Sequence, residues 1–447
     1  MIPLAVLPFR RARCACGIGF GDRMLVVLTV MLVSSAHAFA QAPLTLADAQ
    51  RRAVERSRMV AAQDYAASAA RDMAVAAGQL PDPVATLGVN NLPVDGPDQW
   101  SLTRDFMTMR SVGMMQEFTS SAKREARSAR YEREAEESLA EKAASVTAIQ
   151  RDTALAWLAR YYAEAMLGVI AEQSRQAQLE VDAAEGEYRA GRGSLAEILA
   201  ARNALILFDD RTSEVRRKVA TAKIALARWI GNDADAPLAG NPAIDKIRVD
   251  PATLEADLVH HSDVAVFEKK EEMAAADVRV AQADKKTDWT VALMYSQRGP
   301  AYSNMVSLNV SVPLQWNRSN RQDREVAAKL ALLDQARAER DDMLRAHAAE
   351  VRAMVAEWEN DRERAARYKR ELVPLAKART EAVLAAYRGA KSTMTDVLMA
   401  RRNEIDVRLQ ALQLETDTAR LWAQLNFLVP ADDTGMSAGG NHAEEMQ

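Results

Sequence analysis

The sequence contains little of what most globular domains of its length rely on. Among 447 residues there are only 18 glycines and 14 prolines, and aromatic residues make up 5%. Ala, Arg, Glu, Leu and Asp fill much of the remainder, which is typical of long helices and unlike a β-sandwich or a doubly wound sheet. The formal charge is −4 with acids and bases interleaved, so no basic stripe indicates nucleic acid as a partner.

Cysteine is confined to the N-terminal part of the chain. Cys14 and Cys16 lie ahead of the apolar run 24–33, which follows several arginines and leads into small residues up to Ala40. This order predicts a secretory signal peptide over 1–40, because the apolar run is about half of the roughly 20 residues that a spanning helix needs. A retained membrane anchor is the weaker interpretation. The remaining chain would then hold no cysteine, which excludes disulfides and cysteine-based metal sites there.

Long apolar runs are also missing from the rest of the chain. No other segment reaches the roughly 20 residues of a transmembrane helix. Because lipid satisfies no backbone hydrogen bonds, such a chain can cross a membrane only through strands closed into a barrel.

What the chain does contain is a duplication. The stretch Tyr188–Arg202 recurs 199 residues later as Tyr387–Arg401, and a weaker repetition relates Met114–Arg127 to Val310–Arg324. Solenoid repeats have periods of about 20–50 residues, so this spacing indicates two copies of one large unit.

Each copy predicts the same order of elements: a helix, a β-hairpin, a long helix, a turn and a second helix. The first copy gives helices 45–79, 120–187 and 195–230 with strands 84–92 and 109–118; the second gives helices 251–286, 320–387 and 394–428 with strands 289–297 and 305–313. Thr45 and Asp48 predict a capping box at the first helix start. Pro374 predicts a kink or local irregularity inside the long helix of the second copy.

These elements divide the chain into five predicted parts. They are the signal peptide 1–40, a first structural repeat 41–231, an equatorial linker 232–250, a second structural repeat 251–430 and a tail 431–447. The tail is rich in Gly, Ser and acidic residues, which predicts disorder.

The predicted strands of the second copy alternate between apolar and small polar residues. One face carries Trp289, Val291, Leu293 and Tyr295, and the other carries Thr290, Ala292, Met294 and Ser296. In a soluble protein the apolar face would meet a core. The strands also have the length of roughly 9–11 residues that a membrane-barrel strand needs, with lipid on one side and water on the other.

The element lengths predict an oligomer. A helix of about 68 residues spans on the order of 100 Å, several times the width of a globular domain, and two shorter helices placed end to end match it. Four strands cannot close a barrel, since small barrels need about eight, and open edges cannot face lipid. Three chains supplying twelve strands are the smallest arrangement with an ample lumen.

Several motifs now support a family resemblance. Both turns share the pattern Tyr-x6-[Leu/Met]-x-[Glu/Asp]-x-Leu, and the strand ends Gln116–Phe118 and Val312–Leu314 accompany the helix–hairpin–helix order. These features resemble the TolC family of outer-membrane efflux proteins over nearly the whole mature sequence. The segments Asn91–Asp98 and Ser101–Arg110 further resemble its heavy-metal branch, which serves cobalt–zinc–cadmium or copper–silver pumps of the RND type.

The resemblance implies a mainly helical, internally duplicated chain that forms a trimeric α-barrel and a 12-stranded β-barrel with four strands per chain. It implies a Gram-negative outer membrane location extending into the periplasm, no cofactor and no enzymatic activity. The implied partners are two further copies of the chain in a homotrimer, outer-membrane lipid, a periplasmic adaptor (membrane fusion protein) and an inner-membrane RND pump.

The resemblance also implies a periplasmic gate and two adaptor-contacting tips. The gate residues would be Asp396, Tyr387 and Lys391, although Ser392 occupies the position of the family's tip arginine and Met399 that of a second acid. Three symmetry-related carboxylates at a constriction would attract cations. The alternative is that Asp396 and Glu197 only stabilise the first turn of a helix. The tip residues are Gly191, Gly193, Ser194, Gly389, Ser392 and Thr393.

Candidate metal ligands are few. His260 and His261 are adjacent, so on a helix they would point apart, and an exposed helix is the favoured interpretation. The methionine cluster Met107, Met109, Met114 and Met115 could meet a soft cation, but apolar filling of strands is the favoured role. The sequence therefore predicts no metal site.

Three other functions remain open. The same duct could serve drug efflux or type I protein secretion, or the chain could be a soluble periplasmic coiled-coil scaffold or adaptor. An enzyme is the weakest alternative, because the sequence holds no nucleophile–base set, no P-loop and no glycine-rich dinucleotide motif.

Overall fold

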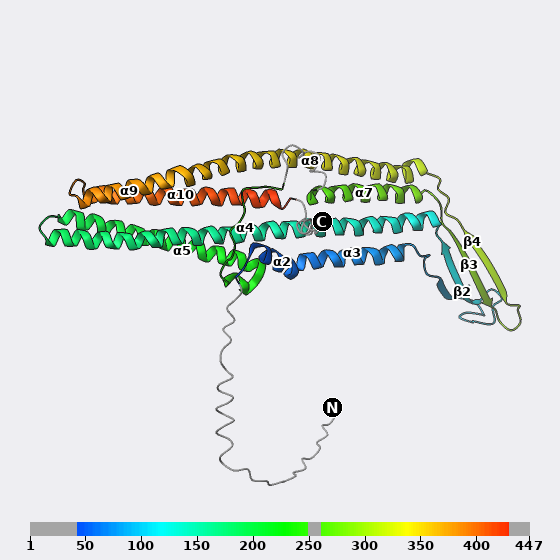
Figure 1. The fold of residues 1–447 in the computed structure, drawn as a ribbon. Coiled ribbons are helices and arrows are strands. Elements are labelled where there is room, and N and C mark those ends of the chain that lie inside the picture. The colour runs from blue at the N-terminus through cyan, green and yellow to red at the C-terminus, as the bar shows by residue number, and fades with distance from the viewer. Residues whose placement is uncertain (1–42, 249–260, 429–447) are drawn as a thin grey trace, which may run out of the picture. The chain divides into compact units, whose positions relative to one another are not determined.

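The computed structural model describes residues 43–248 and 261–428 (Figure 1). The first repeat contains helices α2 (Leu46–Arg56), α3 (Arg58–Ala77), α4 (Ser121–Arg189) and α5 (Leu195–Ile230) with strands β1 (Val84–Asn90) and β2 (Met109–Phe118). The second contains α7 (Ser262–Ala283), α8 (Gln322–Arg367), α9 (Val373–Arg388) and α10 (Met394–Asn426) with β3 (Trp289–Gln297) and β4 (Met305–Ser311). The predicted signal peptide 1–40, the start of the helix predicted at 251–286 and the tail 431–447 lie outside the described residues.

The long helix of the first repeat organises the helical part. α4 has 69 residues and spans on the order of 100 Å; it contacts α2 and α3 over one half and α5 over the other (Figure 1). In the second repeat α7 and α10 lie in the same way beside α8 and α9. The predicted pairing of one long helix with two shorter ones is therefore confirmed.

The prediction of a single helix over 45–79 is wrong, because this stretch forms two helices, α2 and α3. Ser57 ends α2 and begins α3 with an extended backbone (φ −66°, ψ 123°), and its hydroxyl accepts a hydrogen bond from the Val60 N–H at 3.3 Å. Serine competes for backbone partners in this way and favours helix ends. At the start of α2 the capping box is only half formed: Thr45 caps the Asp48 N–H, but the Asp48 carboxylate accepts from the Thr45 hydroxyl at 2.7 Å.

The irregularity predicted at Pro374 is confirmed. A π-helical turn, Tyr368–Leu372, separates α8 from α9 and ends two residues before the proline. Proline cannot donate to the carbonyl of the preceding turn, and a wider turn accommodates the missing hydrogen bond.

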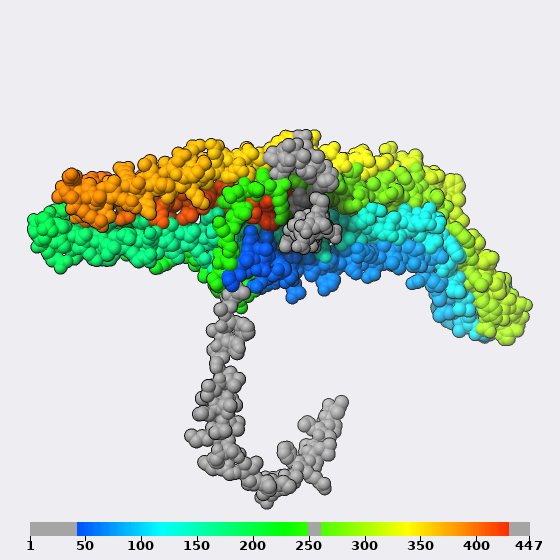
Figure 2. Space-filling view, viewed as in Figure 1, coloured from blue at the N-terminus to red at the C-terminus, as the bar shows by residue number. Residues whose placement is uncertain are grey.

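The four strands form one antiparallel sheet in the order β1-β2-β3-β4. Each hairpin belongs to one repeat, and the β2–β3 pairing, from Arg110↔Gln297 to Phe118↔Trp289, joins the two repeats. The sheet lies at one end of the helical elements (Figure 2). The register places apolar residues on one face: Ala85, Leu87, Val89, Val112, Met114, Phe118, Trp289, Val291, Leu293, Tyr295, Val306, Leu308 and Val310.

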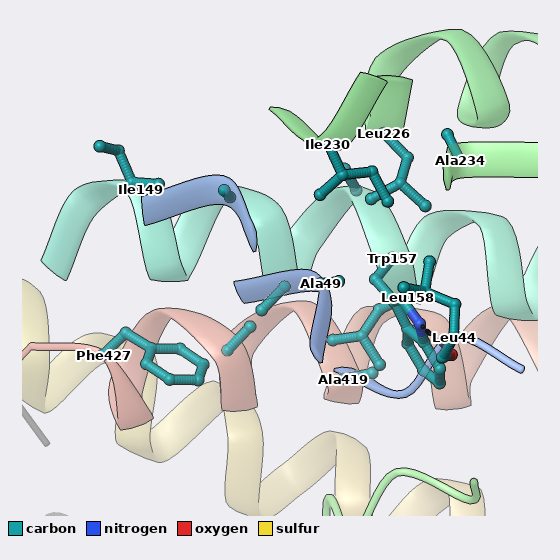
Figure 3. Close-up of a cluster of buried hydrophobic side chains, with 14 of the residues drawn as sticks. Leu44, Ala49, Ile149, Trp157, Leu158, Leu226, Ile230, Ala234, Ala419 and Phe427 are labelled. Carbon is teal, nitrogen blue, oxygen red and sulfur yellow. Dashed lines mark hydrogen bonds between the residues drawn. The ribbon is translucent and has the colours of Figure 1, made fainter. Parts of the chain in front are cut away.

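The main apolar core lies where α2, α4, α5 and α10 meet (Figure 3). Trp157 at its centre is 1% exposed, and its Nε1–H donates to the Leu44 carbonyl at 3.2 Å. This hydrogen bond satisfies the only polar group of the indole inside the core. Across 43–248 and 261–428, no helix is both long and apolar enough to cross a membrane.

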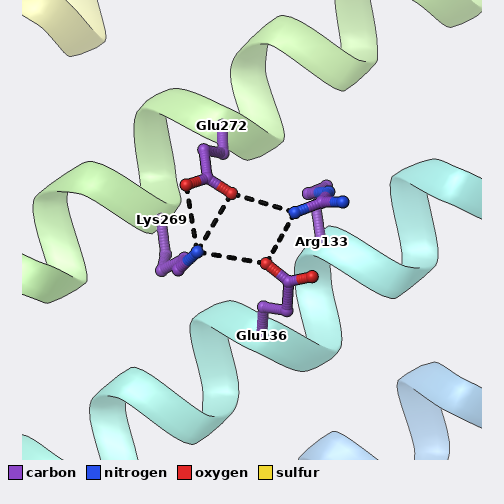
Figure 4. Close-up of polar contacts among 4 residues, drawn as sticks. All are labelled: Arg133, Glu136, Lys269 and Glu272. Atoms are coloured by element: carbon purple, nitrogen blue, oxygen red, sulfur yellow. Dashed lines mark hydrogen bonds and ion pairs between the residues drawn. The ribbon is translucent and has the colours of Figure 1, made fainter.

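Ion pairs join the two repeats in the helices nearest the sheet. Lys269 on α7 lies 3.1 Å from Glu136 on α4, and Arg133 on α4 lies 3.1 Å from Glu272 on α7 (Figure 4). Closer to the sheet, the buried Lys123 of α4 pairs with Asp288 at 2.7 Å. Each helix contributes both a cation and an anion to these pairs, so the pairs favour the observed alignment of α4 against α7.

Candidate functional site

The first helical tip is the turn between α4 and α5. Ser194 and Glu197 form a complete capping box: the Ser194 hydroxyl accepts from the Glu197 N–H at 3.3 Å, and the Glu197 carboxylate accepts from the Ser194 N–H at 2.8 Å. Gly191 has a φ of +73°, which glycine adopts without strain. Arg192 donates to both carboxylate oxygens of Glu187, at 2.8 and 3.2 Å, and this lowers the Glu187 pKa.

Gly193 allows the first tip to close tightly. A Cβ at this position would lie 2.9 Å from the backbone nitrogen of Tyr188, closer than real side chains approach. The Gly193 N–H donates to the Glu187 carbonyl at 3.1 Å, which occupies one of the free acceptors at the end of α4.

The second tip, between α9 and α10, has the same kind of cap. Asp396 Oδ2 accepts hydrogen bonds from the Thr393 N–H at 3.0 Å, the Thr393 hydroxyl at 2.7 Å and the Ser392 hydroxyl at 3.0 Å. The Thr393 bonds, and then the Ser392 hydroxyl, lower the Asp396 pKa. The structure thus brings together three residues that the sequence named, and Asp396 carries its charge in the first turn of α10.

The left-handed residue of the second tip was missed by the sequence analysis. It is Ala390, with a φ of +55°, and not Gly389, whose φ is −87°. The signal was present in the duplication, because Gly191 aligns with Ala390 at the constant offset of 199. A Cβ in this region costs roughly 1–2 kcal/mol, so the second tip carries local strain that the first lacks.

The two other predicted gate residues, Tyr387 and Lys391, differ in burial. Tyr387 is half-buried against the apolar cluster of Val181, Ala184, Ile198, Ala201, Met394 and Val397. Burial raises its pKa, as do the nearby charges of Glu187 and Glu197. Lys391 is exposed, and within the described part of the chain it forms no ion pair. No hydrogen bond joins Tyr387 or Lys391 to Asp396 in this part either.

A groove of about 840 Å³ separates the two tips. Its lining includes Glu187, Arg192 and Glu197 from the first tip and Tyr387, Ser392 and Thr393 from the second. Residues of both tips, with charges of both signs, therefore line the same groove.

A buried charge network closes this groove and was not anticipated from sequence. Arg401 on α10 lies 3.1 Å from Glu180 on α4 and 3.6 Å from Glu404. Burial raises the Glu180 pKa, against the opposing charge of Arg401. The repeat offers a clue, since Arg202 aligns with Arg401 and binds Glu185 of α4 at 2.7 Å. Burial of the second pair could not be read from that alignment.

The exposure expected for His261 is wrong. His261 is 1% exposed at the start of α7, and its Nδ1 lies 2.6 Å from Nε2 of the buried His347 on α8. His347 lies 86 residues from His261, so no local sequence pattern indicates their contact. His260 lies outside the described residues. In the described ranges no group of three or more His, Cys, Asp or Glu could hold a metal ion.

The fold is that of outer-membrane channels of known structure. The outer-membrane channel OprN matches with a TM-score of 0.72 and 16% identity, over 86% of this chain and 90% of that chain. VceC of Vibrio cholerae matches at 0.69 and 17%, over 86% and 95%, and the channel-forming CusC at 0.69 and 17%, over 87% and 93%. No family model and no curated protein sequence matches. The likeness confirms the mainly helical fold with four antiparallel strands per chain.

Proposed function

We propose that this chain is one protomer of a trimeric duct in the outer membrane of a Gram-negative bacterium, the exit component of a tripartite RND efflux system. The observation that carries the proposal is the apolar face of the sheet, which the single chain leaves open: Leu87 is 83% and Leu308 67% exposed. An apolar surface across four strands marks contact with protein or lipid. The match in fold to outer-membrane channels supports lipid and a passive transport role.

The sheet also supports trimer formation. β1 and β4 are its two edges, and their unpaired backbone groups cannot face lipid. About eight strands are needed to close a small barrel, so one chain is insufficient, and three chains supply twelve. The helices would continue this wall into the periplasm.

The tips would then meet the other components. Gly191, Gly193 and Ser194 in the first tip, with Gly389, Ser392 and Thr393 in the second, would contact the periplasmic adaptor, which links the duct to the inner-membrane RND pump. The complete caps at Ser194 and Thr393 support this role, because they hold each turn in one conformation before a partner binds.

Asp396, Tyr387 and Lys391 would form the periplasmic constriction. Threefold symmetry would bring three Asp396 carboxylates around one axis, where they would repel one another and attract cations. An aspartate carboxylate at this position would be charged at neutral pH, as the constriction requires, while its lowered pKa follows from the cap bonds of Thr393 and Ser392.

The proposed cargo is a heavy-metal cation. The support is the resemblance of Asn91–Asp98 and Ser101–Arg110, which cover the loop after β1 and the first two residues of β2, to the heavy-metal branch. The alternatives for the same duct are drugs, in drug efflux, or a polypeptide, in type I protein secretion. We further propose the chain division given above, with a cleaved signal peptide 1–40, repeats 41–231 and 251–430, a linker 232–250 and a tail 431–447.

Membrane extraction and conductance test the proposal together. The chain expressed with its N-terminal segment should fractionate with outer membranes, require detergent for extraction and have three times the protomer mass by light scattering. In a planar bilayer it should conduct ions without an energy source. A monomer that extracts without detergent would favour the soluble scaffold instead. For cargo, a deletion strain should be compared on zinc, cobalt, cadmium, copper, silver and a panel of drugs.

A further inference from the structure

A pocket of about 870 Å³ lies where the sheet meets the helices. Its strand residues are Phe118 at the end of β2 and Trp289 at the start of β3, whose rings stack with centroids 4.5 Å apart. Both belong to the apolar face of the sheet, whereas the neighbouring pair Glu117 and Thr290, on the opposite face, does not line the pocket. The pocket therefore belongs to the apolar side of the sheet, at the end nearest the helices.

The charged residues that line this pocket are all cations. They are Arg124 of α4, Lys285 and Lys286 after α7, and Arg318 in the turn before α8. The groove between the two tips is different, because its lining holds three acids and three bases: Glu180, Glu187, Glu197, Arg192, Arg388 and Arg401. Four cations with no acid in the described lining suit a negatively charged ligand.

Three of the four cations also lack a carboxylate partner. Lys285 pairs with Asp323 at 2.5 Å. Within 43–248 and 261–428, Arg124, Lys286 and Arg318 form no ion pair, and the buried Nε–H of Arg124 has no hydrogen-bond partner there. Like charges around one pocket repel one another, so an anion bound between them would relieve that repulsion.

The aromatic residues place the pocket at a membrane surface in the proposed duct. Trp289 is 44% exposed, and Trp316, which follows the lining residue Leu314 by two positions, is 87% exposed. In membrane barrels, aromatic residues flank the apolar band and lie at the level of the lipid headgroups. This end of the sheet adjoins the helices that would enter the periplasm, so the pocket would lie at the inner leaflet of the outer membrane.

We propose that this pocket binds the headgroup of an anionic phospholipid, of the phosphatidylglycerol class, from that inner leaflet. The cations hold the phosphate, to which the free Nε–H of Arg124 can donate, and the acyl chains lie along the apolar face beyond Phe118 and Trp289. Basic pockets beside membrane-spanning segments bind anionic headgroups in this way. The inference rests on the proposed duct, since only there does the pocket meet a membrane. Threefold symmetry gives three such sites per trimer.

Lipid titration of the purified trimer tests the pocket. The delipidated trimer in a neutral detergent would be titrated with phosphatidylglycerol and, separately, with phosphatidylcholine, and the bound lipids counted by native mass spectrometry. The wild type should bind phosphatidylglycerol at least about tenfold more tightly than phosphatidylcholine. Arg124→Gln/Lys286→Gln/Arg318→Gln should lose this preference, because it removes the three cations that have no ion pair.

The matched control removes the same amount of charge elsewhere. Arg175→Gln/Arg216→Gln/Arg217→Gln replaces three exposed arginines on α4 and α5, away from the sheet, and should keep the wild-type preference. Trimer mass and circular dichroism confirm that each variant folds. If the triple pocket variant does not fold, Lys286→Gln/Arg318→Gln changes only exposed residues and should weaken the preference at least about threefold.

The possible failures are distinguishable. Equal binding of the two lipids by the wild type, or an unchanged preference in the pocket variants, would overturn the pocket. Displacement of the lipid by an equal concentration of glycerol phosphate, which is the headgroup anion without acyl chains, would overturn the lipid as its ligand. A conducting trimer without lipid preference refutes the pocket and leaves the duct intact, whereas a monomer that extracts without detergent refutes the duct and the lipid site with it.

Discussion

The two helical tips come from matching stretches of the duplicated chain, yet they handle charge differently. In the first tip Arg192 is paired with Glu187. In the second, Ala386 stands where Glu187 would be, and the matching cation, Lys391, has no ion pair within 43–248 and 261–428. Duplication has thus preserved the helix cap in both tips while leaving the second with an exposed, unneutralised cation available to another chain.

The helices that lead away from the tips also differ: the matched arginine is exposed in the first repeat and buried in the second. Arg202, behind the first tip, is 58% exposed at its side chain and pairs with Glu185 in solvent. Arg401, its match behind the second tip, is 13% exposed and lies between Glu180 and Glu404. The second tip therefore combines a buried ion-pair network between its helices with an exposed, charged turn.

The largest expected effect comes from breaking the buried network. Arg401→Ala leaves Glu180 and Glu404 buried without their cation, and we expect a loss of about 3–5 kcal/mol in the free energy of unfolding. Arg202→Ala, the matched change in the first repeat, removes an exposed pair worth less than about 1 kcal/mol. Guanidinium unfolding of the detergent-solubilised protein, followed by circular dichroism, measures both. Similar losses for the two variants would remove the distinction between the repeats.

The left-handed residues of the tips should respond in opposite directions. Gly191→Ala introduces a Cβ at a φ of +73° and should destabilise the first tip by about 1 kcal/mol. Ala390→Gly releases strain at +55° and should stabilise the second tip by up to about 1 kcal/mol. Hydrogen exchange of the amides flanking each turn reports the local change. Two shifts of the same sign would contradict the assignment of strain to Ala390.

Elements and tips differ in how far the sequence predicts them. The bounds of β2, β3 and α5 follow from the alternation and the glycine breaks alone, because those patterns act over a few residues. The break at Ser57 was missed, since one serine with helical neighbours on both sides gives only a weak local signal. Contacts such as Glu180–Arg401 join residues 221 apart, and no local pattern encodes which of two matching arginines becomes buried.

The two helix caps should contribute similar amounts to the free energy of unfolding. Ser194→Ala and Thr393→Ala each remove the hydroxyl that accepts from the third residue of the following helix, which typically costs about 1 kcal/mol. Unfolding measured as above should give two losses that agree within about 0.5 kcal/mol. A much larger loss for Thr393→Ala would show that the second cap supports contacts between protomers as well as its own helix.

The smallest expected effect is a dependence on pH. It distinguishes a role of Asp396 in the constriction from a role in the helix cap alone. Its folded pKa lies below the ordinary value because Thr393 and Ser392 donate to the carboxylate, so its contribution is present above the unfolded pKa and is lost as pH falls through the folded value. Acidification from neutral pH toward and below the usual aspartate range should therefore weaken protection of the second tip against hydrogen exchange. Asp396→Asn should flatten this dependence without changing that of the first tip. In bilayers the same acidification should reduce cation preference only if the three carboxylates line the constriction, so a pH-dependent tip with constant ion selectivity would assign Asp396 to the cap alone.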